Sequence, residues 1–147
     1  MLRTKKVLQV NPTVEGNRVE PVASSFFVYD YNEKEIIIKR LEGVKECYAF
    51  IDTPNVSWIN IDGLRKDTVE SICAHYGIHF LIAEDILSLG QRPKMDEING
   101  LIFCLLNMLY FNEKESAVET EQISLVLGKD FVLSFQEDDK RDVFNPL

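Results

Sequence analysis

The longest apolar run of the chain, residues 101–106 (Leu-Ile-Phe-Cys-Leu-Leu), contains no polar residue. A strand with one face in water alternates apolar and polar side chains, so a strand without this alternation is expected to be covered on both faces. Asn99-Gly100 precedes the run and favours a two-residue hairpin turn, because both residues tolerate positive φ. The run therefore predicts a strand inside a sheet that has helices on both faces. It is far shorter than the roughly twenty apolar residues of a membrane-spanning helix.

The other strands are predicted from aromatic and β-branched residues that lie between polar turns. In the first half, residues 25–31 and 35–41 form a hairpin candidate, and residues 56–61 form a third strand. The second half is predicted to be an antiparallel meander of four strands, at residues 94–98, 101–111, 121–127 and 131–135.

Helices are predicted where apolar residues recur with a period of three to four. A brief helix is expected at residues 44–51, a longer one from Asp67 to Gly77, and a short one at residues 81–89. Asp67 and Glu70 have the spacing of a capping box, and Gly77 and Gly90 stand where a helix would end. The elements together predict an α/β fold with a mixed, largely antiparallel sheet.

Residues 1–20 have weak periodicity and include Pro12 and Gly16 among charged residues, so we expect a loosely ordered lead-in before one domain at residues 21–147. Cys47, Cys73 and Cys104 are far apart and form no Cys-x-x-Cys pair, which is typical of reduced thiols in a core. No hydrophobic signal segment follows Met1, so an intracellular chain is expected.

The formal net charge is -8, from 16 Lys+Arg and 24 Asp+Glu. This balance argues against nucleic acid or an anionic membrane as the main partner, since both require a basic face. Cations or basic proteins are the expected partners.

Glu84 and Asp85 are the first candidate site, with Asp96 and Glu97 a few residues later. Mg²⁺ takes one or two carboxylates and keeps several waters, so such a pair is enough for half a site. Adjacent helical residues point about 100° apart, however, so the two carboxylates cannot chelate one ion as a simple pincer. On spacing alone, solvated carboxylates that complement a helix dipole are the favoured alternative.

His75 and His79 are the second candidate, because two histidines four residues apart can ligate zinc. Gly77 interrupts the helix between them and no third ligand has matching spacing, so structural histidines are favoured. A hydrolase that uses His79 with Glu84 or Asp85 lacks a nucleophile elbow or a phosphate loop, and we expect no enzyme. The segment from Gln91 to Lys94 is the third candidate: its basic residues can meet the nearby acids or a neighbouring chain, or the segment is a turn that leads into a strand.

Six motifs in order resemble the cytoplasmic domain of the CorA family of magnesium and cobalt channels. They are residues 58–64 (WINIDGL), 76–87 (YGIHFLIAEDIL), 91–94 (QRPK), 121–127 (EQISLVL), 135–137 (FQE) and 142–146 (DVFNP). The resemblance covers residues 56–146, and the ordered spacing of the motifs makes it specific. One difference is Phe80, which stands where the family usually has proline.

The resemblance implies an α/β/α sandwich and a regulatory domain on the cytoplasmic face of a membrane transporter for Mg²⁺, with Co²⁺ as a further ion. It also implies a homopentameric ring in which divalent ions between neighbouring domains hold the channel closed, with Glu84 and Asp85 as the metal-binding pair. The chain ends at Leu147, before the stalk helix that is expected to supply a partner carboxylate and before the two membrane helices and Gly-Met-Asn loop. Zinc-transporting relatives share this architecture, and a stand-alone acidic α/β interaction domain is the alternative.

Overall fold

The computed structural model describes residues 19–137 and Phe144. Most of the predicted lead-in, and most of the last motif, lie outside this part of the chain. The described residues form a seven-stranded sheet with short helices between its strands. The elements are β1 (Ser25–Tyr31), β2 (Ile36–Leu41), α1 (Val44–Cys47), η1 (Tyr48–Phe50), β3 (Val56–Asp62), α2 (Lys66–His75), α3 (Phe80–Leu87), β4 (Lys94–Ile98), β5 (Leu101–Asn112), β6 (Ala117–Leu127) and β7 (Phe131–Gln136).

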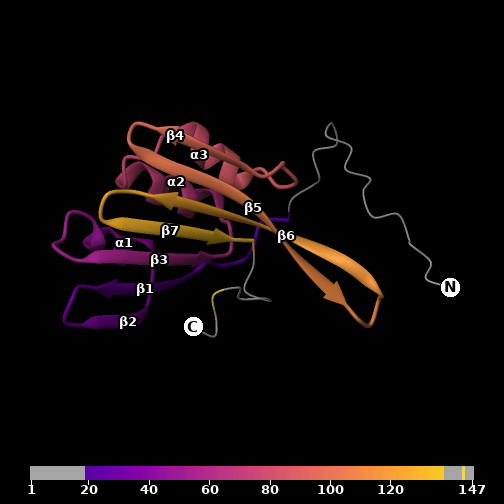
Figure 1. Cartoon of the computed structure of the whole chain (residues 1–147), viewed down its shortest axis with the longest axis horizontal. Coiled ribbons are helices and arrows are strands. Elements are labelled where there is room, and N and C mark those ends of the chain that lie inside the picture. Colours follow the sequence, from indigo (N-terminus) through magenta and orange to yellow (C-terminus); the bar gives the residue numbers. More distant parts are fainter. Residues whose placement is uncertain (1–18, 138–143, 145–147) are drawn as a thin grey trace.

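The strand order is β2-β1-β3-β7-β6-β5-β4 (Figure 1). The first hairpin and β3 are antiparallel neighbours, and β4 to β7 form the predicted meander. The two halves meet where β3 runs parallel to β7, with Ile59 opposite Leu133. This arrangement confirms the prediction of an α/β fold with a mixed, largely antiparallel sheet.

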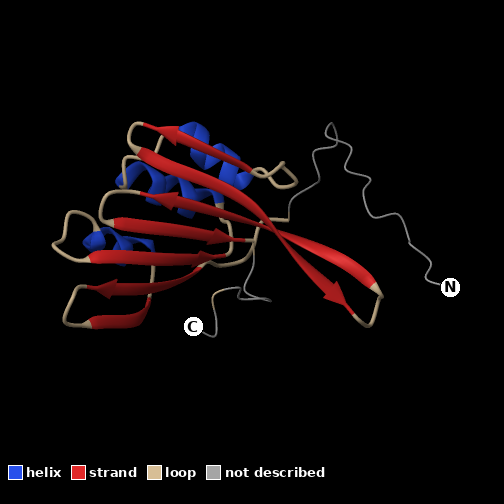
Figure 2. Cartoon of the chain, viewed as in Figure 1, coloured by secondary structure: helices blue, strands red, loops and turns tan. Residues whose placement is uncertain are grey.

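The main core lies between the sheet and its helices. Side chains of alternate residues on the central strands, such as Ile59 on β3 and Leu133 on β7, are fully buried together with Ile72 of α2 and Ile86 of α3. Figure 2 shows the helices of the described part behind the sheet, on one face. The described residues therefore supply the predicted helical layer on that face.

The apolar residues 101–106 lie on β5, and their side chains alternate between the two faces of the sheet. Phe103 and Leu105 point to the core and are fully buried, whereas Ile102 and Leu106 on the opposite face are 39% and 42% exposed. Among the described residues, no helix covers the face of β5 that carries Ile102 and Leu106, so the predicted cover on that face is not supplied by this part of the chain. An unbroken apolar sequence here still alternates in burial because strand side chains alternate between faces.

The opposite face also carries a polar network at its centre. The Trp58 Nε1–H donates to Ser134 Oγ at 2.8 Å, and the Ser134 hydroxyl donates to Asn60 Oδ1 at 2.7 Å. Gln136 donates to Asp62, and all of these side chains except Trp58 are buried. The network joins β3 to β7 across the parallel pair, where the two halves of the chain meet.

Strands β5 and β6 extend beyond the rest of the sheet as a twisted two-stranded ribbon (Figure 1). Strand β6 starts at Ala117, four residues before the predicted start. Tyr110 and Asn112 on β5 donate to Glu121 and Glu119 on β6, which ties the two strands of the ribbon together.

The ends of α2 confirm one sequence prediction and correct another. Gly77 has a φ of +66°, and the Ile78 N–H donates to the Cys73 carbonyl at 2.8 Å, so the predicted glycine ends the helix. The N-cap is Arg65, with no side-chain cap. Asp67 lies in the first turn and pairs with Arg65, so the predicted capping box is wrong.

Candidate metal site

Helix α3 carries both predicted metal ligands. It begins after His79, whose Nδ1 accepts a hydrogen bond from the Leu81 N–H at 3.2 Å and caps the helix. Ile82 and Ile86 are buried in the core, one turn apart. This packing fixes the rotation of the helix: Asp85 is half-buried, and Glu84 is exposed.

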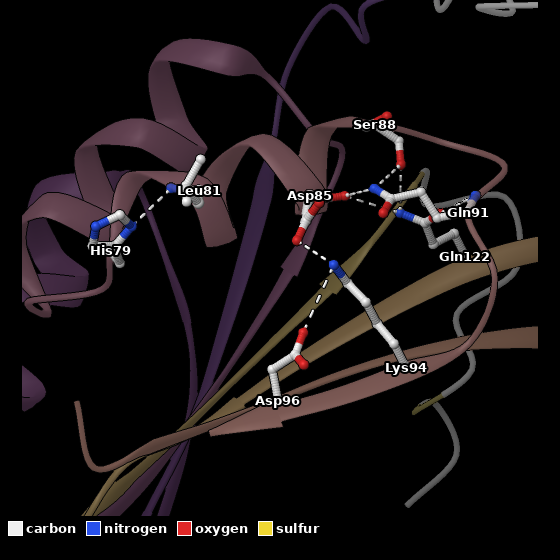
Figure 3. Close-up of polar contacts among 8 residues, drawn as sticks. All are labelled: His79, Leu81, Asp85, Ser88, Gln91, Lys94, Asp96 and Gln122. Carbon is white, nitrogen blue, oxygen red and sulfur yellow. Dashed lines mark hydrogen bonds and ion pairs between the residues drawn. The ribbon is translucent and has the colours of Figure 1, made fainter. Parts of the chain in front are cut away.

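The carboxylate of Asp85 forms an ion pair with Lys94. The Lys94 Nζ lies 2.5 Å from Asp85 Oδ2 and 3.8 Å from Asp96 Oδ2, as Figure 3 shows. The Asp85 and Lys94 side chains are 31% and 35% exposed, so the pair is partly shielded from water. The prediction that basic residues of the segment 91–94 meet nearby acids is confirmed for Lys94.

The position of Lys94 follows from strand β4. Lys94 pairs in register with Leu105, whose side chain points to the helices, and Lys94 therefore shares that face of the sheet. Its ammonium also lies 5.8 Å from the ring centroid of the buried Phe103. The register of β4, the Asp85 carboxylate of α3 and the Phe103 ring together place the Lys94 ammonium near the C-terminal end of α3.

Two glutamine side chains hold the C-terminal end of α3. The Gln91 Nε2 donates to the carbonyl oxygens of Asp85 and Ser88 at 2.9 and 3.0 Å. The Gln122 Nε2, from β6, donates to the Ser88 carbonyl at 3.1 Å (Figure 3). Sequence reasoning assigned no role to either glutamine. Both lie within the motifs, but only the fold brings Gln122 to the helix end.

The other two acidic residues near the Asp85–Lys94 ion pair, Asp96 and Glu97, point to opposite faces of the sheet. Asp96 shares the helix-side face with Lys94, whereas Glu97 is the next residue along β4 and points to the opposite face. Within residues 19–137 and Phe144, no group of three or more histidine, cysteine or acidic side chains is placed to hold a metal ion. Of the two predicted ligands, Glu84 has an exposed side chain, and the carboxylate of Asp85 is paired with the Lys94 ammonium.

His75 and His79 both have structural contacts. The His75 ring stacks on Tyr48 at a centroid distance of 4.0 Å, and its Nε2 lies 3.3 Å from the Tyr48 carbonyl oxygen. His79 caps α3. The interpretation as structural histidines is favoured by these contacts over a zinc pair.

The sequence is similar to those of known metal-ion transport proteins. The family model described as CorA-like Mg²⁺ transporter protein matches residues 54–144. The cobalt/magnesium transport protein CorA of Thermotoga maritima is 37% identical over 121 residues. The match covers 82% of this chain but only 34% of that protein, so the chain spans about a third of its relative's length.

Solved structures share the fold. The ZntB cytoplasmic domain from Vibrio parahaemolyticus matches with a TM-score of 0.56 and 12% identity, over 79% of this chain and 46% of that one. The soluble domain of CorA from Methanocaldococcus jannaschii matches with a TM-score of 0.51 and 14% identity, over 82% of this chain and 43% of that one. Within the described ranges, no helix is long and apolar enough to cross a bilayer.

Proposed function

The chain belongs to the CorA-like family of Mg²⁺ transporter proteins, and from that premise we propose that it is a regulatory cytoplasmic domain that senses divalent cations through Glu84 and Asp85. The observation that carries the proposal is the placement of Asp85. Its carboxylate lies in the last turn of α3, where it pairs with the positive charge of Lys94. The transported ion is proposed to be Mg²⁺ or Co²⁺, the two ions in the name of the Thermotoga relative.

The donor chemistry of the two residues fits this role. Carboxylate oxygens are the ligands that Mg²⁺ prefers, and Mg²⁺ needs only one or two of them because it keeps several waters. Glu84 points to solvent and Asp85 lies beside β4, so the two carboxylates face different directions. We expect each to contribute to a different ion or a different side of a subunit interface, with the remaining ligands from a neighbouring copy.

Regulation would follow from binding linkage. A divalent ion supplies positive charge that offsets the repulsion between carboxylates of adjacent copies, and it favours whichever assembly it binds more tightly. In a homopentamer, the form with ions between the domains would be the closed one. When the cation concentration falls, Glu84 and Asp85 would repel acids across the interface and favour the open form.

The test compares the Mg²⁺ response of the wild type with that of Glu84→Gln/Asp85→Asn. Thermal unfolding and sedimentation are measured in the complete gene product, with MgCl₂ or CoCl₂ against NaCl at matched ionic strength. At ten times the dissociation constant, a bound ion stabilises by about 1.4 kcal/mol, which raises the Tm. The double variant is expected to lose this response.

The matched control is Asp67→Asn/Glu70→Gln, which removes the same charge from the exposed face of α2. It should keep the full cation response. An unchanged response in Glu84→Gln/Asp85→Asn would refute the proposal and leave a stand-alone acidic interaction domain. A parallel titration with ZnCl₂ tests whether the chain is closer in function to zinc transporters.

A further inference from the structure

Lys94 occupies the position on Asp85 that a bound cation would need. We infer that Lys94 is a built-in competitor of the divalent cation: its ammonium neutralises Asp85 when no ion is bound, and an ion gains Asp85 only by displacing it. The inference rests on the proposed function and adds to it a residue that sets the affinity and charge selectivity of the site.

The geometry makes the two cations mutually exclusive at Asp85. The Lys94 Nζ lies 2.5 Å from Asp85 Oδ2 and donates a close charge-assisted hydrogen bond to it. A metal ion on the same oxygen would lie within a few ångströms of the ammonium, and like charges at that distance repel strongly in a partly buried site. Since the pair is only about a third exposed, water screens this repulsion incompletely.

Asp96 offers the displaced ammonium a second partner. Its Oδ2 lies 3.8 Å from Lys94 Nζ, two residues further along β4 on the same face. Lysine has a flexible four-carbon stem with three rotatable donors. A small rotation therefore moves the charge from Asp85 to Asp96, so release of Asp85 does not leave the ammonium without a carboxylate.

The competition favours divalent over monovalent ions. Na⁺ and K⁺ carry the same single charge as the tethered ammonium, and they gain little by replacing it. A divalent ion has twice the Coulomb attraction to the carboxylate and can offset the loss of the ion pair. Lys94 would thus keep the site from responding to the monovalent salt of a cell while it lowers the affinity for divalent ions.

The test is Lys94→Met, which removes the charge but keeps an aliphatic chain over Phe103. We expect the Mg²⁺ concentration at half-maximal stabilisation to fall about two- to fivefold, which corresponds to an ion pair of about 0.4–1 kcal/mol. Monovalent salt should also stabilise this variant more than the wild type. Lys94→Gln should show the same direction if the methionine variant fails to fold.

The control is Arg92→Met, which removes one positive charge from the same segment. Arg92 is exposed, and its side chain makes no ion pair with a described residue. A midpoint shift in Lys94→Met that Arg92→Met does not reproduce supports direct competition. Equal shifts in both variants would show that the effect comes from the loss of any positive charge in this segment, which would overturn the inference. An unchanged or higher midpoint in Lys94→Met would also overturn it.

A double-mutant cycle of Asp85→Asn and Lys94→Met separates the two proposals. In NaCl the cycle measures the Asp85–Lys94 coupling, which should be favourable; in saturating MgCl₂ it should disappear or reverse. If the wild-type response requires Asp85 but the coupling is the same in both salts, the competition alone fails. If Glu84→Gln/Asp85→Asn leaves the cation response intact, the proposed function fails and the competition fails with it.

Discussion

Phe80 gives a sharp test of how α3 begins, because it stands at the first helical position after the His79 cap. A residue there has no carbonyl partner for its N–H within the helix, so proline at this position loses no helical hydrogen bond. His79 has φ -59° and ψ 140°, a conformation that the residue before proline prefers. Phe80 is also 65% exposed. The backbone at residue 80 is therefore compatible with proline, and the substitution Phe80→Pro tests where α3 begins.

The stability of Phe80→Pro is compared with that of Phe80→Ala, because both variants lose the phenyl ring and its contribution to stability cancels. Proline fixes φ and lowers the entropy of the unfolded chain, which stabilises by about 0.4–1 kcal/mol where the native backbone is compatible. We expect Phe80→Pro to be more stable than Phe80→Ala by that amount. In a domain of this size, the difference is about 1–4 °C in Tm.

The matched control lies one residue later. Leu81 is also exposed, but its N–H donates to His79 Nδ1. Leu81→Pro removes this cap, at about 0.5–2 kcal/mol, and forces Phe80 away from the helical conformation. Leu81→Pro should therefore be less stable than Leu81→Ala by at least about 1 kcal/mol.

The assay is urea unfolding of the four variants, followed by far-UV circular dichroism. The reasoning is refuted if proline has the same sign relative to alanine at both positions. A lower stability of Phe80→Pro than of Phe80→Ala would show that α3 does not begin at this residue.

Two further predictions concern the core. Burial raises the pKa of Cys47 and of Cys73 from 9.0 to about 12, so between these values the unfolded chain loses thiol protons that the folded chain keeps. Stability should therefore fall as pH rises from 9 toward 12, by up to about 1.4 kcal/mol per pH unit for each thiol, and Cys73→Ala should reduce the slope of stability against pH. Leu105→Ala should destabilise by about 2–5 kcal/mol and Leu106→Ala by less than about 1, because only Leu105 is fully buried. Similar losses in urea unfolding would show that the opposite face of β5 is covered after all.

Local patterns predicted most element boundaries, because burial on one face imposes a period of two on strands and of 3.6 on helices. They did not predict the start of β6, since Val118 and Thr120 in the ribbon face no core and need no apolar pattern. The parallel pairing of β3 with β7 joins segments about 75 residues apart and has no local signal. The side on which helices pack also depended on tertiary structure, which turned an unbroken apolar run into alternating buried and exposed residues.

The candidate site was predicted in part for the same reason. Glu84, Asp85 and Lys94 lie within ten residues of each other, so sequence alone suggested that acids and bases meet there. It did not show which acid would pair with Lys94. That choice depends on the rotation of α3 over its core residues and on the register of β4 with β5, both of which arise from long-range packing.

The difference between Glu84 and Asp85 has a consequence for sensing. Because α3 buries Ile82 and Ile86, the 100° step between adjacent residues sends Asp85 toward β4 and Glu84 into solvent. A cation on Glu84 displaces only water, whereas a cation on Asp85 has to displace an ammonium held by β4. Under the proposed function, Glu84 contributes attraction, and Asp85 couples the ion to β4, which lies at the edge of the sheet. Asp85 is then the carboxylate that binds a cation less readily, and it is also the one whose binding displaces a side chain of β4.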